Sequence, residues 1–244
     1  MPALPALQAR SAWRWLRTLA LLLLYPACMS RAVAEESPQA ILALDNLEQK
    51  HGSIARMRLE NWRTLIHTAG NLNDLEKLQH VNEFFNQVTF VNDIDHWGVE
   101  DYWATPTQLL TSNGGDCEDF SIAKYFTLRQ MGIPADHLRL TYVKALKLNQ
   151  AHMVLTYFKT PGVDPLVLDN LVDGIQRASS RDDLLPVYSF NAEGLWLARE
   201  RGNEQHIGKP ERLSRWKEVV ARINTEQLPQ SWTPGKRKRT PGKI

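Results

Sequence analysis

Apolar residues recur every three or four positions in three successive stretches after the N-terminal region, a pattern typical of amphipathic helices. The stretches are PQAILALDNLEQKHG (38–52), SIARMRLENWRTLIHTAGN (53–71) and LNDLEKLQHVNEFFNQV (72–88). Gly52 and Asn71 close the first two, as residues at helix ends commonly do. The sequence therefore predicts a helical lobe over residues 35–88.

The next segment, residues 90–115, is rich in Trp and Asp and carries few periodic cues. It leads into a further helix that begins at Cys117 and is followed shortly by a Gly and a Pro. Ile122, Phe126 and Met131 form an apolar stripe along this helix. The stripe predicts that one face of the helix is buried.

After residue 137 the apolar period changes to two, which indicates strands. The predicted strands are LRLTYVKAL (138–146), HMVLTYF (152–158) and PLVLDNL (165–171), and PVYSFNAEGLWLA (186–198) is typical of a further hairpin. Their short connections favour antiparallel neighbours. A last helix is predicted over residues 210–226, with Pro210 and Glu211 in its first turn. Helices first and a mainly antiparallel sheet after them define an α+β fold.

The first 34 residues have the layout of a secretory signal peptide. Three arginines precede the apolar run TLALLLLYPAC, and small residues at Ala32 and Ala34 precede Glu35. The run is short for a membrane span. We expect cleavage near Glu35 and export of the remaining chain, the alternatives being an uncleaved membrane anchor and lipid attachment at Cys28.

Removal of the predicted signal peptide changes the charge. The whole chain has 29 basic and 27 acidic residues, and residues 35–244 keep 25 basic residues against 27 acidic, a net charge of about −2. Five of those bases lie in the tail GKRKRTPGKI, so residues 35–235 carry about −7, which argues against nucleic acid as a partner. Residues 229–244 are expected to be a basic, disordered tail, with contact to anionic lipid as the alternative.

Cys117 would be the only cysteine of the exported chain, which excludes an intramolecular disulfide. A lone thiol in an oxidising compartment suggests a function, and a buried inert cysteine is the alternative. The start of a helix favours the reactive thiolate, because free N–H groups and the helix dipole stabilise negative charge. However, Asp116, Glu118 and Asp119 surround the thiol, and their charge disfavours the thiolate. The sequence leaves this conflict open.

His152 opens the second predicted strand, and Asp169 lies near the end of the third. Neighbouring antiparallel strands can bring such positions side by side, and a carboxylate beside an imidazole fixes its tautomer and stabilises its protonated form. Alone, His152 would more simply be a structural residue and Asp169 part of a turn. The order of cysteine, histidine and aspartate on a helix start and two adjacent strands favours a catalytic group.

The motifs GGDCEDFSIAKY, AHMVLTYF and VLDNL resemble those of the bacterial transglutaminase-like cysteine proteases of the LapG type. Cys117 and His152 are 35 residues apart, and His152 and Asp169 are 17 apart. The resemblance is strong from Trp97 to Asp173 and extends in outline to the helical lobe and the last helix. It implies a papain-like, transglutaminase-like fold with Cys117 as nucleophile, His152 as general base and acid, and Asp169 as the group that orients it.

The resemblance also implies a function. Members of this family are periplasmic, calcium-dependent endopeptidases that cut a large surface adhesin near its N-terminus at a paired-alanine site and so release cells from biofilms. An inner-membrane receptor for cyclic di-GMP sequesters the protease. We expect one protease domain over residues 35–228, divided into the helical lobe (35–88) and residues 89–228 with the catalytic helix, the sheet and the last helix, and a monomer when the protein is free.

Calcium offers a solution to the conflict at Cys117, because a hard cation bound by the crowded carboxylates would neutralise them. Asp116 and Glu118 are the first candidate ligands and Asp119 is the third. Without a metal, Asp116 would cap the helix while Glu118 and Asp119 complement its dipole, and the residues alone leave both interpretations open.

Other functions remain compatible with the sequence. A transglutaminase or an amidase would use the same three residues with a different acyl acceptor. A binding protein that docks on a receptor or an adhesin would need no reactive thiol. Zinc binding through Cys117 and His152 is the weaker idea, because no other histidine has ligand spacing.

Overall fold

The computed structural model describes residues 38–160, 162–200 and 203–226 of the 244-residue chain. The predicted signal peptide and basic tail lie outside the described residues. Within the described part, no helix is long and apolar enough to cross a membrane.

The helices predicted before residue 88 and from Cys117 onward lie close to the observed ones, and the structure adds α4 and α5. The helices are α1 (Pro38–His51), α2 (Ser53–Thr68), α3 (Asp74–Phe85), α4 (Asp93–His96), α5 (Pro106–Ser112), α6 (Cys117–Gln130) and α7 (Ser214–Thr225), with 3₁₀ turns at Ala69–Asn71, Ala135–His137, Ala178–Ser180 and Pro210–Arg212. The prediction for the last helix was wrong at its start. Pro210 and Glu211 lie in a separate 3₁₀ turn, and the α-helix begins at Ser214.

The strands of the described residues form one large antiparallel sheet and one small parallel pair. They are β1 (Thr89–Phe90), β2 (Gly114–Gly115), β3 (Leu138–Ala145), β4 (Gln150–Tyr157), β5 (Leu166–Leu168), β6 (Gln176–Arg177), β7 (Leu184–Phe190), β8 (Leu195–Glu200) and β9 (Asn203–Gly208). The large sheet has the order β6-β5-β4-β3-β7-β8-β9, and β1 pairs with β2. The α+β fold is therefore confirmed, with β6 and β9 as strands that the sequence pattern did not reveal.

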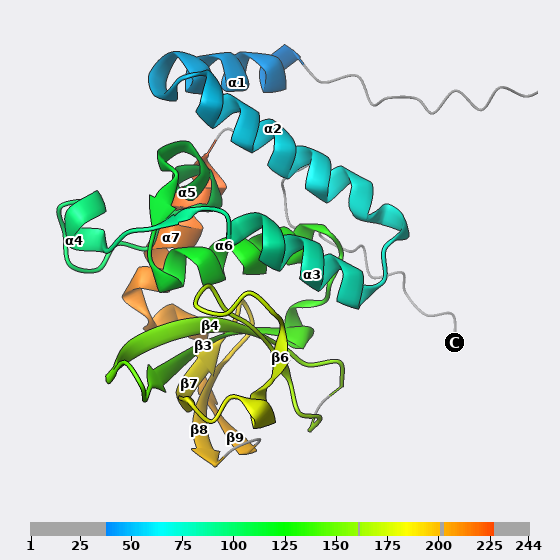
Figure 1. Cartoon of the computed structure of the whole chain (residues 1–244), viewed down its shortest axis with the longest axis vertical. Helices are drawn as coiled ribbons and strands as arrows, with labels where there is room; N and C mark the ends of the chain where they lie inside the picture. Colours follow the sequence, from blue (N-terminus) through cyan, green and yellow to red (C-terminus); the bar gives the residue numbers. More distant parts are fainter. Residues whose placement is uncertain (1–37, 161, 201–202, 227–244) are drawn as a thin grey trace, which may run out of the picture. The chain divides into compact units, whose positions relative to one another are not determined.

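The main core lies between the sheet and the helices. Figure 1 shows α3 and α6 on the same side of the sheet as α2 and α5. Strand residues that face this side alternate along β4, where Met153, Leu155 and Tyr157 join the core cluster that also contains Ile122 of α6. The intervening residue Val154 belongs to a second, smaller apolar cluster on the opposite face. The sheet thus has two buried faces of different size.

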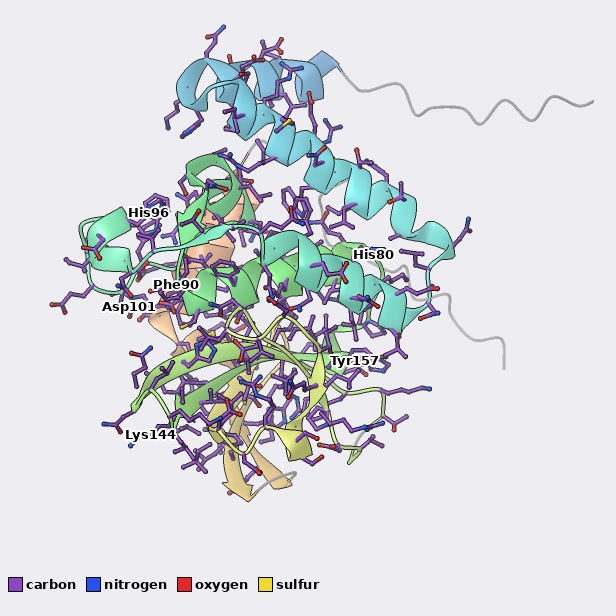
Figure 2. All side chains as sticks on the ribbon, in the orientation of Figure 1. His80, Phe90, His96, Asp101, Lys144 and Tyr157 are labelled. Carbon is purple, nitrogen blue, oxygen red and sulfur yellow. The ribbon has the colours of Figure 1, made fainter. Side chains whose placement is uncertain are left out.

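The segment of residues 90–115 contains two short helices that its weak periodicity concealed. Helix α5 begins with a capping box, in which the Thr105 hydroxyl accepts from the Gln108 N–H and the Gln108 side chain accepts from the Thr105 N–H. Pro106 occupies the first turn, where its missing N–H costs nothing. In Figure 2 the side chains of His96 and Asp101 lie on the loop that contains α4. This loop borders the start of α6 and therefore the cysteine.

Candidate active site

Cys117 is the first residue of α6, and it follows shortly after β2 of the small parallel pair, which ends at Gly115. Gly115 permits this close approach, because a Cβ atom there would lie 2.5 Å from Asp119 Oδ2 and 2.7 Å from Leu109 Cδ1. Asp119 Oδ2 accepts from the Asp116 N–H at 3.3 Å, and Asp119 Oδ1 accepts from the Ala104 N–H at 2.6 Å. These bonds fix the start of the helix to the preceding loop.

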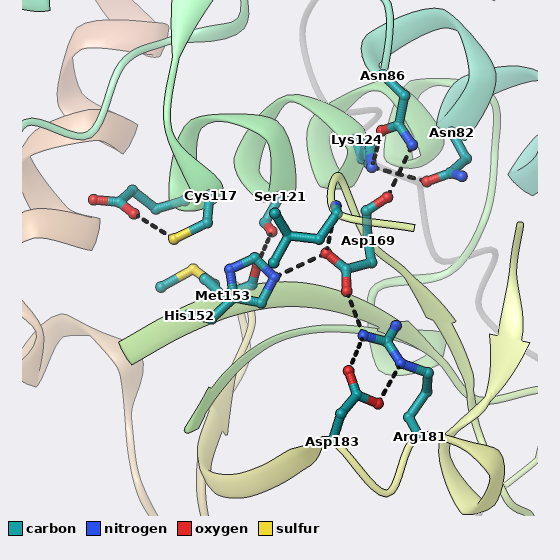
Figure 3. Close-up of polar contacts among 12 residues, drawn as sticks. Asn82, Asn86, Cys117, Ser121, Lys124, His152, Met153, Asp169, Arg181 and Asp183 are labelled. Carbon is teal, nitrogen blue, oxygen red and sulfur yellow. Dashed lines mark hydrogen bonds and ion pairs between the residues drawn. The ribbon is translucent and has the colours of Figure 1, made fainter. Parts of the chain in front are cut away.

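His152 and Asp169 are brought together by β4 and the end of β5. His152 Nε2 lies 2.8 Å from Asp169 Oδ1, and both side chains are almost fully buried. Burial alone would raise the pKa of Asp169, but the hydrogen bond to His152, the Leu171 N–H and Arg181 together hold it below its ordinary value. The carboxylate is therefore ionised and accepts the proton on Nε2. The second imidazole nitrogen lies on the side of Cys117 in Figure 3.

The Cys117 thiol points to Glu118 in this structure. Its Sγ donates to Glu118 Oε2 at 3.1 Å (Figure 3). Burial raises the pKa of Cys117 well above its ordinary value, and the Glu118 and Asp116 carboxylates raise it further, while the Met153 backbone offsets part of the effect. The thiolate is thus disfavoured, as the sequence suggested.

Five acidic side chains gather beside the thiol. Ligand atoms of Asp93, Asp101 and Glu118 lie within 4.8 Å of one another, and so do those of Asp93, Asp116 and Asp119. Burial, followed by the nearby Glu118, raises the pKa of Asp116 to about 9, and burial likewise raises the pKa values of Glu118 and Asp93. Such crowding opposes ionisation of the group as a whole.

Asp93 and Asp101 were not among the sequence-based ligand candidates. Their only signal was the acidic composition of the loop NDIDHWGVED. Asp93 is 2% exposed, which is unusual for a loop aspartate, and its Oδ2 accepts from the Tyr102 N–H at 2.5 Å. Folding of the loop over the start of α6 brings these acids to the predicted residues Asp116 and Glu118.

Two buried basic side chains support the histidine–aspartate pair. Arg181 Nη2 donates to Asp169 Oδ2 at 2.8 Å, and the same guanidinium makes two bonds to Asp183. On the other side, Lys124 Nζ donates to Asn86 Oδ1 at 2.7 Å, and Asn86 donates to the Asp169 carbonyl at 2.9 Å. Figure 3 shows both connections. Sequence reasoning missed Arg181 and Lys124, which have no motif signal.

A helix-borne cysteine beside a buried histidine–aspartate pair on an antiparallel sheet defines the class of cysteine proteinases with a transglutaminase-like fold. The model of the bacterial transglutaminase-like cysteine proteinase family (BTLCP) matches residues 60–201. The chain belongs to this family.

Solved structures of LapG from Legionella pneumophila are similar to this chain over most of its length. The EGTA-treated and calcium-bound forms are both 43% identical in sequence, with TM-scores of 0.66 and 0.65. Each alignment covers 75% of this chain, and it covers 97% and 99% of the respective LapG chain. A comparison with curated protein sequences gave no match.

Proposed function

We propose that this cysteine proteinase is a calcium-dependent periplasmic endopeptidase with Cys117, His152 and Asp169 as its catalytic triad. The observation that carries the proposal is the buried His152–Asp169 hydrogen bond beside Cys117 at the start of α6. The 43% identity to LapG over nearly the whole LapG chain supports the same reaction class.

Each proton transfer in the reaction can be assigned to a residue of the site. His152 takes the thiol proton, and Cys117 Sγ attacks the peptide carbonyl carbon. The backbone N–H of Cys117, at the start of α6, stabilises the resulting oxyanion. His152 then gives its proton to the leaving amine as the C–N bond breaks, which leaves a thioester. Water, deprotonated by His152, hydrolyses the thioester and restores the thiol. Asp169 accepts from Nε2 throughout and stabilises the imidazolium.

The acidic cluster fits calcium. Asp93 Oδ1 and Asp116 Oδ1 are buried and have no hydrogen-bond partner among the described residues. Several carboxylate oxygens within 4.8 Å of one another are the donor set that a hard divalent cation prefers. Asp93, Asp101, Asp116 and Glu118 would hold the ion. Both oxygens of Asp119 already accept backbone N–H bonds, so we assign this residue mainly to fixing the helix start.

Bound calcium would supply positive charge that offsets the carboxylates around the thiol. Glu118 would then be engaged as a ligand and would no longer accept the Cys117 proton, which leaves the thiol available to His152. Asp93 and Asp116 would stay ionised and hold the α4 loop against α6. The family's calcium dependence would therefore combine a structural effect with an electrostatic one.

The calcium site is tested with Asp93→Asn and the matched control Asp95→Asn, an exposed aspartate of the same loop. We expect calcium to raise the melting temperature of the wild type and of the Asp95→Asn variant, with a much smaller rise for Asp93→Asn. Equal rises for the two variants would remove Asp93 from the site.

The triad is tested by incubation of the protein with a polypeptide substrate at saturating calcium. Cleavage should be lost in Cys117→Ala and in His152→Gln, whose folding is checked by circular dichroism. Mass spectrometry of the products distinguishes backbone scission from the transglutaminase and amidase reactions, in which a glutamine side chain gains an amine or becomes glutamate. Backbone scission that persists in Cys117→Ala would exclude this nucleophile.

We further propose that the substrate is the N-terminal region of a large surface adhesin, cut at a paired-alanine site, and that an inner-membrane cyclic di-GMP receptor sequesters the enzyme. The support is the resemblance to LapG-type proteases. The test uses the purified N-terminal region of an adhesin from the same genome. Replacement of the paired alanines by leucines should abolish cleavage, and addition of the receptor's periplasmic domain should inhibit it. Detection of the enzyme in the periplasmic fraction tests its location.

A further inference from the structure

A separate pocket lies on the face of the sheet turned away from α6. Its volume is about 740 Å³, within the range of small-molecule binding sites. Its floor consists of the small apolar cluster, in which Val143, Val154, Val167 and Leu184 are almost fully buried. The pocket is therefore a partly open hollow whose apolar floor consists of strand residues.

Polar groups lie at the two ends of this pocket. Near the start of β3, the Arg139 guanidinium lies over the rings of Trp196 and Phe158, at 4.0 and 4.6 Å from their centroids. Near the end of β3, where Ala145 pairs with Leu184, Arg181 lines the pocket. Both groups line the pocket beside β3, so the pocket suits a molecule that lies along this strand.

Arg181 is one of the residues that line the pocket, and its guanidinium has an unused donor. Its side chain is 4% exposed, and its Nη2 and Nε atoms bond to Asp169 and Asp183. Its Nη1 atom is buried without a hydrogen-bond partner among the described residues. A buried donor of a charged group is costly to leave unpaired, so an acceptor that enters the pocket would gain a strong hydrogen bond there.

The charges around Arg181 decide which acceptor fits. Hydrogen bonds to Arg181 lower the pKa of Asp183, and Asp169 is also held ionised, so the two carboxylates already outweigh the single guanidinium charge. A third carboxylate would lie beside two others in a buried site. A neutral carbonyl or amide oxygen accepts the same hydrogen bond without this repulsion.

We propose that this pocket binds an elongated apolar molecule through a neutral carbonyl or amide oxygen that accepts from Arg181 Nη1. The apolar body lies over the valine floor toward Arg139. Because the same guanidinium donates to Asp169, the bound molecule would contact the His152–Asp169 pair through Arg181. Figure 3 shows the bonds from Arg181 to Asp169 and Asp183.

The experiment titrates biphenyl-4-carboxamide into the full chain labelled with ¹³C at valine methyl groups and follows Val143, Val154 and Val167. Biphenyl-4-carboxylate is the matched charged probe. We expect saturable shifts with the carboxamide, at least about fivefold weaker binding of the carboxylate, and about tenfold weaker carboxamide binding in Arg181→Lys. Absence of saturable shifts would overturn the proposal, and equal or tighter carboxylate binding would overturn the neutral acceptor.

The position of the bound carboxamide is tested with two variants that fill the pocket with a larger side chain, Ala178→Trp and Ala198→Trp. Ala192→Trp is the matched control, because Ala192 is exposed and does not line the pocket. Both filling variants should abolish the carboxamide shifts, while the control keeps them. Shifts that persist in a filling variant with a native methyl spectrum would place the molecule elsewhere and overturn the proposal. The binding test is independent of peptidase activity.

Discussion

Lys124 makes the stability of this protein depend on pH in a way that can be calculated. The side chain is 1% exposed in α6, and burial lowers the pKa of its ammonium group from 10.5 to about 7. In the unfolded chain the group keeps its ordinary pKa. Between pH 7 and 10.5 the unfolded state therefore binds a proton that the folded state lacks, so the free energy of unfolding rises with pH through this window. The slope is about 1.4 kcal/mol per pH unit.

Substitution of Lys124 by Met removes this slope. Urea unfolding of the wild type and Lys124→Met at pH 7 and pH 9 and at fixed calcium concentration isolates the effect, since other groups titrate equally in both proteins. We expect the wild type to gain about 2 kcal/mol relative to the variant between the two pH values, because the folded lysine is already about half deprotonated at pH 7. The exposed Lys217→Met serves as the control and should follow the wild type. Parallel curves for the wild type and Lys124→Met would refute the reasoning, because the lysine would then keep an ordinary pKa when folded.

Further predictions concern the site itself. Arg181→Met leaves the buried Asp169 carboxylate without its cation and should lower the free energy of unfolding by about 3–5 kcal/mol, whereas Arg181→Lys should lower it less. Urea unfolding measures both losses, and a loss below about 1 kcal/mol for Arg181→Met would contradict the buried ion pair. Gly115→Ala pushes a Cβ atom into Asp119 and Leu109 and should cost about 1–3 kcal/mol, with Gly70→Ala, which has open space, as the control. In calcium-free protein the raised pKa of Cys117 should make its alkylation by iodoacetamide slower than that of a free cysteine from pH 7 to 9, and the rate should still rise above pH 9. A rate that reaches a plateau below pH 8 would contradict the raised pKa.

The elements with strong periodicity could be predicted from the sequence. The helices before residue 88, the cysteine helix and strands β3, β4 and β5 all have clear apolar patterns, and the structure contains them. Helices α4 and α5 were missed because they have only four and seven residues and so show no apolar stripe. Strand β6 has only two residues, so it could show no alternation.

The candidate site, like the fold, could be predicted only in part. The spacing of Cys117, His152 and Asp169 on predicted elements was enough to expect their approach, and the structure shows the His152–Asp169 bond. The positions of Asp93, Asp101 and Arg181 depend on how loops fold back over α6 and under β5. No periodic sequence pattern specifies which distant residues an irregular loop contacts, so these residues could not be assigned to the site from the sequence.

The bond between Cys117 and Glu118 also affects how long the enzyme survives before it meets a substrate. Oxidants, like electrophilic substrates, react with the thiolate, and a cysteine that is oxidised to sulfinic acid is lost. A partly buried thiol whose proton is held by a carboxylate resists the first oxidation step. A chain in which Glu118 holds the thiol proton is therefore a storage form of the nucleophile, and the change that makes the thiol reactive also exposes it to oxidation.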